Sequence, residues 1–169
     1  MADLLGELVH VVECPVDVTL GPVVVLREIW ERTLVALGDA RVDVGGVRGV
    51  VLGVPAPIDS RLGTVTSSAQ LPGWDQQNLY EVIGQFTELP VSIENDANLL
   101  ALGEFRAVAA SVEHMLAVKV GSRIGSGVVV GGGLYSGASG AAGEISHSRS
   151  SGRSVIHCWC GTPDCLESV

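Results

Sequence analysis

Three cysteines lie within eight residues near the C-terminal end of the 169-residue chain: Cys158, Cys160 and Cys165. Thiolates are soft ligands that suit zinc, and a structural zinc ion takes four sulfur or imidazole ligands in a tetrahedron. Two upstream histidines, His147 and His157, offer the fourth ligand. We expect His147, because the polar loop after it can close on the cysteines, whereas His157 adjoins Cys158 and would have to fold back sharply. The spacing therefore predicts a structural zinc site.

Buried thiols without metal, or one disulfide with a spare cysteine, are the alternative interpretation of this cluster. Three cysteines in so short a stretch favour metal over that alternative. The remaining cysteine, Cys14, stands alone in an apolar stretch, where we expect an inert core thiol.

A second group of polar side chains follows the apolar, strand-like segment 90–94. This group contains Asn95 and Asp96, and a helical pattern of apolar residues continues after it. Asn and Asp are the residues that cap helix N-termini, so one of the two is expected to be a cap. Two polar residues at the carboxyl end of a strand are more than a cap needs, which makes this junction a candidate site.

Glycines recur in the stretch 121–127, between two apolar segments. A glycine-rich turn between strands can present backbone N–H groups to phosphate oxygens. Hairpins also need glycine simply because their turns require positive φ. This signal is therefore weak when taken alone.

The elements that must position these groups follow from hydrophobic periodicity. Period-two alternation or short apolar runs indicate strands, and recurrence at three to four residues indicates helices. We expect a hairpin or two short strands at 4–18, a helix at 22–37 ended by Gly38, a buried central strand at 47–54, a helix at 79–86, a strand at 90–94 followed by a helix, and strands at 115–120 and 128–130.

Composition narrows the class of protein. Hydrophobic residues make up 47 % of the chain and aromatic residues only 4 %, as parallel strands with helical crossovers require. The formal net charge is -9, and no run of Lys or Arg occurs, so we expect no nucleic-acid contact through this segment. No apolar run reaches the roughly 20 residues of a membrane span, and the start lacks a signal peptide. We therefore expect no membrane partner and a cytoplasmic location, where a reducing environment favours metal over disulfide.

Several strings resemble signatures of the ROK family, which contains bacterial sugar kinases and sugar-responsive transcriptional regulators. Residues 143–147 read GEISH, residues 158–167 read CWCGTPDCLE, and residues 94–98 read ENDAN. The resemblance implies an α/β fold: an actin-like ATPase (ribonuclease H-like) lobe with a mixed sheet and flanking helices, incomplete, plus the start of a second lobe that carries the zinc knuckle. It places most of the first lobe at 1–110, without its first phosphate hairpin, and the beginning of the second at 111–169.

The resemblance also implies roles for individual residues. It predicts that the side chains of Asn95, Asp96, Glu144, His147 and Glu167 contact the hydroxyl groups of a sugar. In a kinase, Asp96 would be the base that deprotonates the attacking hydroxyl. Phosphoryl transfer needs positioning and a proton acceptor more than covalent help, so this assignment is chemically sensible.

The glycine-rich stretch resembles the second phosphate loop of actin-like kinases, which implies cofactor contacts from Gly121, Ser122, Gly125 and Gly127. This chain has Ser122-Arg123 where the loop usually has Thr-Gly. A bulky arginine in a loop that encloses phosphates favours a regulator over a kinase, although its charge could also help to bind phosphate.

We therefore expect the sugar-sensing effector domain of a ROK-type transcriptional regulator, whose DNA-binding winged helix is not in this chain. The alternative is a fragment of an ATP-dependent hexose kinase that would need Mg-ATP, and we expect this piece alone to be inactive. A zinc-stabilised structural domain without a small ligand is a third hypothesis. Exposed sheet edges of an incomplete lobe would favour a homo-oligomer.

Overall fold

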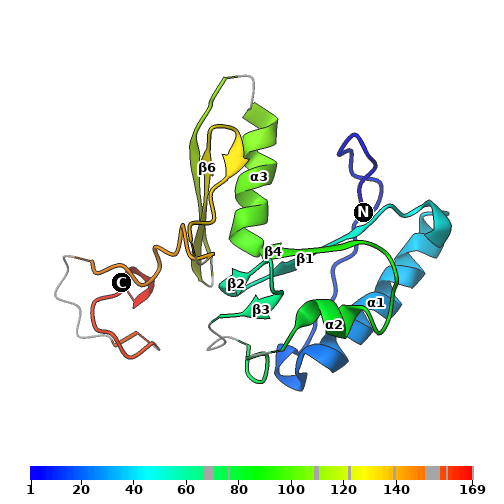
Figure 1. Ribbon diagram of the computed structural model, residues 1–169, viewed down its shortest axis with the longest axis horizontal. Helices are drawn as coiled ribbons and strands as arrows, with labels where there is room; N and C mark the ends of the chain where they lie inside the picture. The colour runs from blue at the N-terminus through cyan, green and yellow to red at the C-terminus, as the bar shows by residue number, and fades with distance from the viewer. Residues whose placement is uncertain are drawn as a thin grey trace.

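The computed structural model describes residues 1–66, 71–75, 77–108, 111–121, 123–138, 140–150, 157–158 and 160–168. Helices and strands alternate along the first two-thirds of the chain (Figure 1). The helices are α1 (Pro22–Asp39), α2 (Leu79–Ile83) and α3 (Asp96–Val108), with single turns η1 (Val18–Leu20), η2 (Val44–Gly46) and η3 (Leu166–Ser168). The strands are β1 (Val50–Val54), β2 (Ile58–Asp59), β3 (Thr64–Val65), β4 (Val91–Asn95), β5 (Met115–Val120), β6 (Ile124–Val130) and β7 (Gly133–Leu134).

The main hydrophobic core forms around the parallel pair β1–β4 and the helices α1 and α2. Strands β1 and β4 pair in register from Val50 with Val91 to Val54 with Asn95. Apolar side chains from these elements and from the loops beside them fill this core because burial removes their surface from water. The buried members are Val25, Leu26, Val54, Ala56, Ile58, Val65, Leu71, Trp74, Leu79, Val82, Ile83 and Ile93.

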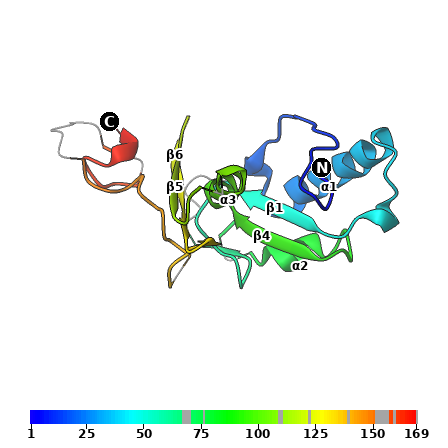
Figure 2. The same ribbon diagram turned by 90° about the horizontal axis from the view of Figure 1, so that it is seen from above.

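Helix α3 packs between two sheets. Figure 2 shows it beside β1 and β4 on one side and β5 and β6 on the other, with the C-terminal segment beyond β5 and β6. Strands β5, β6 and β7 form an antiparallel sheet. Gly127 of β6 allows the close approach, since a Cβ built there would lie 2.6 Å from Ala101 Cβ and 2.7 Å from Ala97 O.

The predicted helices at 22–37 and 79–86 and the strands at 90–94 and 115–120 are confirmed, with shifted ends. Gly38 lies inside α1 rather than after it, so it does not end the helix. The strand predicted at 128–130 begins four residues earlier, at Ile124, because its glycines meet α3 as part of the sheet.

The prediction of strands at 4–18 is wrong. This segment has a single isolated bridge, Ala2 to Leu8, and side chains such as Leu4 and Leu5 are exposed. Alternating apolar residues form a strand only when a neighbouring strand accepts their hydrogen bonds, and none is placed there among the described residues. Cys14 is accordingly half-buried and outside any strand, which corrects its assignment as a core thiol in a strand.

The predicted central strand at 47–54 is shorter and less buried than expected. Strand β1 pairs with β4 alone among the described strands, and Val51 is 63 % exposed. The apolar run of β1 therefore does not place this strand in the centre of a sheet among the described strands. None of the helices in the described parts of the chain is both long and apolar enough to span a membrane.

Candidate functional site

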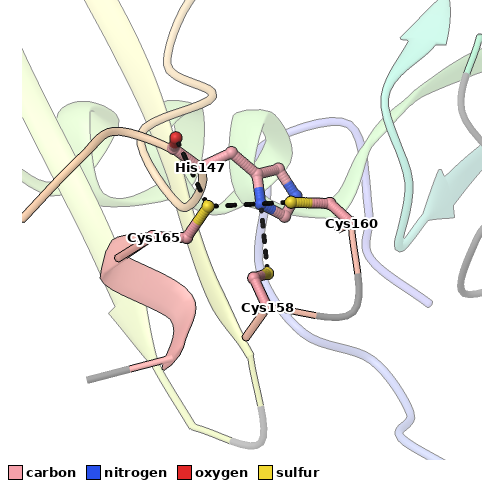
Figure 3. Close-up of side chains that lie close together, drawn as sticks. All are labelled: His147, Cys158, Cys160 and Cys165. Atoms are coloured by element: carbon pink, nitrogen blue, oxygen red, sulfur yellow. Dashed lines mark hydrogen bonds between the residues drawn. The ribbon is translucent and has the colours of Figure 1, made fainter. Parts of the chain in front are cut away.

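Four potential metal ligands converge at the C-terminal end of the described chain. The side chains of His147, Cys158, Cys160 and Cys165 each offer one ligand atom, and these atoms all lie within 4.8 Å of one another (Figure 3). This is the set that the sequence predicts. His157 is exposed, pairs through its backbone with Pro163, and is not part of the cluster.

The spacing of the ligand atoms fits a zinc ion. His147 Nδ1 lies 3.6 Å from Cys158 Sγ, and the Sγ atoms of Cys160 and Cys165 lie 3.6 Å apart. With Zn–S near 2.3 Å and Zn–N near 2.0 Å, ligand atoms of a tetrahedral site lie about 3.5 to 3.8 Å apart. A disulfide would need its two sulfurs at about 2.05 Å. The donor set and its geometry therefore fit structural zinc and not a disulfide.

Backbone hydrogen bonds between the turn η3 and the residues on either side of His147 bring His147 to the cysteines. Backbone hydrogen bonds join Leu166 N–H to Ser148 O at 2.9 Å and Glu167 N–H to Ser146 O at 2.8 Å. Asp164, which stands where the resembling motif has glycine, has a φ of 62°. Asp tolerates this left-handed conformation better than most residues, so the turn forms without glycine.

The thiols of this cluster differ in their readiness to ionise. Hydrogen bonds from the backbone and side chain of Thr162 lower the pKa of Cys160 to about 6. Burial, and after it the neighbouring thiols Cys160 and Cys158, raise the pKa of Cys165 to about 12. Crowded sulfurs of this kind repel one another as thiolates, and a bound cation is what would allow all of them to ionise.

Asn95 and Asp96, the two polar residues at the junction between β4 and α3, make different contacts. Asn95 is the helix cap, because its Oδ1 accepts hydrogen bonds from Ala97 N–H at 2.8 Å and Asn98 N–H at 3.1 Å. Its Nδ2 donates to Ala56 O at 3.0 Å, and the residue is 8 % exposed. The structure therefore gives Asn95 a structural role, and its predicted sugar contact stays a prediction.

Asp96 begins α3 and points its carboxylate at β5. Its Oδ2 lies 2.5 Å from Lys119 Nζ, and the side chains are 34 % and 42 % exposed, respectively. Lys119 is not among the residues predicted from the sequence. The available signal was that it is the sole lysine of the chain, placed in an otherwise apolar strand.

Glu144 lies within electrostatic range of both His147 and Asp96. Desolvation raises the pKa of the Glu144 carboxyl above its usual value; the charge of His147 lowers it and that of Asp96 raises it. These charges act on Glu144 because the three side chains are near one another. Glu144 thus lies near two other residues of the predicted sugar site, and the sugar contacts of all three stay a prediction.

Glu167 is held by the turn between β5 and β6. Its side chain is only 6 % exposed; Oε2 accepts a hydrogen bond from Ile124 N–H at 2.9 Å, and Oε1 lies 3.5 Å from Arg123 Nη1. The last turn of the described chain is thereby tied to the start of β6. The predicted sugar contact of Glu167 would use a carboxylate that already has these two partners.

The predicted phosphate-contacting residues are spread over a turn and a strand. Gly121 lies in the turn after β5, Gly125 and Gly127 lie within β6, and Ser122 lies outside the described residues. Gly125 and Gly127 face Ala97 and α3 closely, so packing alone accounts for these two glycines. Their predicted cofactor contacts stay a prediction.

Comparison with known proteins places these features in one family. The model of the ROK family matches residues 20–169. A glucokinase from Halalkalibacterium halodurans is 30 % identical over 165 residues, which is 97 % of this chain and 50 % of that enzyme. A putative xylose repressor from Caldicellulosiruptor sp. is 38 % identical over 124 residues, which is 73 % of this chain and 31 % of that protein.

Solved structures agree with the sequence relatives. The ROK hexokinase from Thermus thermophilus superposes with a TM-score of 0.72 at 32 % identity, over 91 % of this chain and 50 % of that enzyme. The fold is therefore of the ROK actin-like ATPase type, and the family's members include both sugar kinases and sugar-responsive repressors. The chain spans half of the glucokinase and about a third of the repressor. It belongs to the ROK family.

Proposed function

We propose that this chain binds a sugar between α3 and the zinc knuckle, as the sugar-sensing effector module of a ROK-type transcriptional regulator. The observation that carries the sugar site is the proximity of Glu144 to both Asp96 and His147, each of which acts on the pKa of the Glu144 carboxyl. Carboxylates accept hydrogen bonds from hydroxyl groups, and an imidazole can donate or accept. Such a set suits a neutral, hydroxyl-rich ligand.

The zinc knuckle would contribute one residue, His147, to this site. Its ligands would be His147, Cys158, Cys160 and Cys165, and four protein ligands leave no open position for catalysis. A zinc ion on Nδ1 of His147 would fix the orientation of the ring and leave Nε2 as the nitrogen that bonds to a hydroxyl group. Metal and sugar binding are therefore coupled in this proposal.

Arg123 favours a regulator over a kinase. It stands at the turn where the resembling kinases have glycine, and its guanidinium group contacts Glu167 at 3.5 Å. Strand β6 begins immediately afterwards, so the turn is short and carries a large side chain. These features support binding of a sugar without binding of a nucleoside triphosphate at this turn.

An ATP-dependent hexose kinase is the second candidate. The observation that favours it is the match to the glucokinase over 97 % of this chain and to the hexokinase with a TM-score of 0.72. In that case Asp96 would accept the proton of the attacking hydroxyl, and Mg-ATP would bind near Gly121, Ser122, Gly125 and Gly127.

Isothermal titration calorimetry of the zinc-loaded chain tests the sugar site. The panel is D-glucose, D-mannose, D-galactose, D-xylose and N-acetyl-D-glucosamine, each with Glu144→Gln as the matched variant. We expect one or more sugars to bind and Glu144→Gln to weaken that binding about tenfold, as loss of a charged hydrogen bond does. Failure of the whole panel would contradict the proposal and leave the third hypothesis, a purely structural zinc domain.

A phosphorylation assay separates the two candidates. The complete gene product, the bound sugar and Mg-ATP are incubated together, and sugar phosphate is measured with ATP-free controls. A regulator gives sugar binding without sugar phosphate. Formation of sugar phosphate that is lost in Asp96→Asn would establish the kinase instead.

Three further proposals concern organisation. We propose a first lobe at 1–110 and the start of a second at 111–169, a cytoplasmic location, and self-association without nucleic-acid contact through this segment. Self-association is supported by the exposed apolar face of β5, where Leu116 and Val120 are 59 % and 77 % exposed. Light scattering that shows a monomer at high concentration would contradict it.

A further inference from the structure

Lys119 is the sole lysine of the chain and lies one residue before the end of β5. Its Nζ lies 2.5 Å from Asp96 Oδ2, and both side chains are partly open to solvent, at 42 % and 34 % exposure. The ion pair therefore stands at the surface of the site and joins β5 to the first residue of α3. A lysine ammonium has three donors, so the contact with Asp96 uses only part of its hydrogen-bonding capacity.

The opposite strand makes room for this arrangement. Lys119 pairs in register with Gly125 of β6. A Cβ at Gly125 would lie 3.7 Å from Lys119 Cε and 3.1 Å from Ala97 Cβ. The absent side chain thus leaves a path along which the aliphatic part of Lys119 reaches the helix N-terminus. Gly125, predicted as a phosphate contact, has this steric function in the structure.

We infer that Lys119 is a specificity-determining residue of the sugar site, which positions Asp96 and reads a vicinal diol together with it. This inference rests on the proposed sugar-binding function. An ionised carboxylate only accepts hydrogen bonds, and an ammonium group only donates them. Side by side, Asp96 accepts from one hydroxyl group of the sugar, and Lys119 donates to the oxygen of the next.

The same geometry gives Asp96 a binding role. Lys119 holds one carboxylate oxygen, and the direction of the other is thereby fixed. Charge-assisted hydrogen bonds are shorter and stronger than neutral ones, so a correctly aimed pair distinguishes sugars by the arrangement of two adjacent oxygens. Methylation of the hydroxyl group that donates to Asp96 removes that hydrogen bond and leaves the carboxylate oxygen without it, whereas the oxygen that accepts from Lys119 remains an acceptor when methylated.

Nuclear magnetic resonance of the chain labelled with ¹³C,¹⁵N-lysine tests the inference directly. Because the chain has one lysine, the side chain gives a single Cε–Nζ reporter. We expect this reporter to shift on titration with whichever of D-glucose, D-mannose, D-galactose, D-xylose or N-acetyl-D-glucosamine binds, and to shift also in Asp96→Asn without sugar. No substitution is needed for the first result, so it does not depend on a variant that folds.

Calorimetry of two variants completes the test. Lys119→Met keeps the aliphatic volume and removes the charge, and we expect it to weaken sugar binding about tenfold. Lys119→Arg keeps the charge and should restore most of the affinity. Arg32→Met is the matched control, because the Arg32–Glu28 pair on α1 has almost the same exposure, 46 % and 35 %. We expect it to leave affinity unchanged.

The outcomes separate this inference from the function on which it rests. If no sugar of the panel binds the zinc-loaded chain, both are overturned. A different set of results would overturn only the role of Lys119. In that case a sugar binds and Glu144→Gln weakens its binding, but the signal of the Lys119 reporter does not shift and Lys119→Met binds the sugar as tightly as the wild type does. The sugar site would then stand.

Discussion

The main core and the zinc knuckle are stabilised in different ways. The core around β1, β4, α1 and α2 buries twelve apolar side chains from separate parts of the chain. In the knuckle, comprising residues 145–150, 157–158 and 160–168, the buried residues are Ser146, Cys158 and Cys165. Two of the three are predicted metal ligands. A segment this short cannot form a sufficient hydrophobic core, and a metal ion bound by the cluster would supply most of its stability.

Polar contacts join the knuckle and the residues just before it to β6. Glu167 accepts a hydrogen bond from Ile124 N–H, and Ser126 Oγ donates one to Gly143 O. Both contacts reach β6, which packs on α3. Order in the knuckle therefore bears on the position of Glu144 and His147 relative to Asp96, whereas the core does not depend on the metal. The experiments below test this contrast.

Metal removal should have the largest effect. Structural zinc supplies roughly 10–16 kcal/mol of apparent free energy in small zinc-dependent units, so chelation should unfold the knuckle. Hydrogen exchange after treatment with EDTA should show lost protection at residues 145–150, 157–158 and 160–168, with protection in β1, β4 and α2 retained. Cys165→Ser should reproduce this pattern and abolish stoichiometric zinc.

Unchanged protection of the knuckle after complete removal of zinc would contradict the contrast between the regions. A mutant Cys158→Ser that kept stoichiometric zinc would contradict the ligand assignment. Zinc affinity should also fall at acidic pH, because thiolate and imidazole ligands must lose their protons to bind.

Truncation of the core should have the next largest effect. Leu79 is fully buried, and Leu79→Ala should lower the free energy of unfolding of the main domain by about 2–5 kcal/mol. Urea denaturation followed by far-UV circular dichroism measures this loss. Zinc content of the folded protein should stay at its wild-type value, and a loss of zinc without unfolding would show that the regions are not independent.

Substitution of two glycines by alanine distinguishes the effect of close packing on stability from the effect of backbone flexibility. A Cβ at Gly127 would overlap Ala101 Cβ at 2.6 Å, so Gly127→Ala should destabilise the protein by about 1–3 kcal/mol. Gly103 lies within α3 with no atom within 4 Å of such a Cβ, so Gly103→Ala should stabilise it by about 0.5–1 kcal/mol. Thermal unfolding of both variants checks the opposite signs; equal signs would refute the packing role of Gly127.

Local signals predicted the parts of the molecule that depend on neighbours in sequence. The junction at Asn95 and Asp96 was recognised because a strand, a cap and a helix follow one another directly. The ligands His147, Cys158, Cys160 and Cys165 were recognised because few other arrangements bring such residues into one short segment. The structure places these four side chains together.

Features that depend on distant residues were missed. The sequence predicts a glycine-rich turn between strands at Gly125 and Gly127, whereas both lie in β6 where α3 approaches. The pairing of Lys119 with Asp96 joins residues 23 positions apart, and no local pattern indicates it. The wrong strand prediction at 4–18 has the same origin, since strand formation depends on a partner elsewhere in the chain.

Two ion pairs of similar exposure should give the smallest changes in stability. Arg32–Glu28 on α1 measures 2.7 Å, and Lys119–Asp96 measures 2.5 Å. Partly exposed pairs contribute about 0.2–1 kcal/mol, because water screens the charges and ordering two long side chains costs entropy. Arg32→Met and Lys119→Met should therefore each change the free energy of unfolding by about 0.5 kcal/mol in urea titrations. If Lys119→Met lowered the free energy of unfolding several times more than this, its ion pair would hold β5 against α3. The two ion pairs, although alike in exposure, would then differ in their contribution to stability as well as in their proximity to the proposed sugar site.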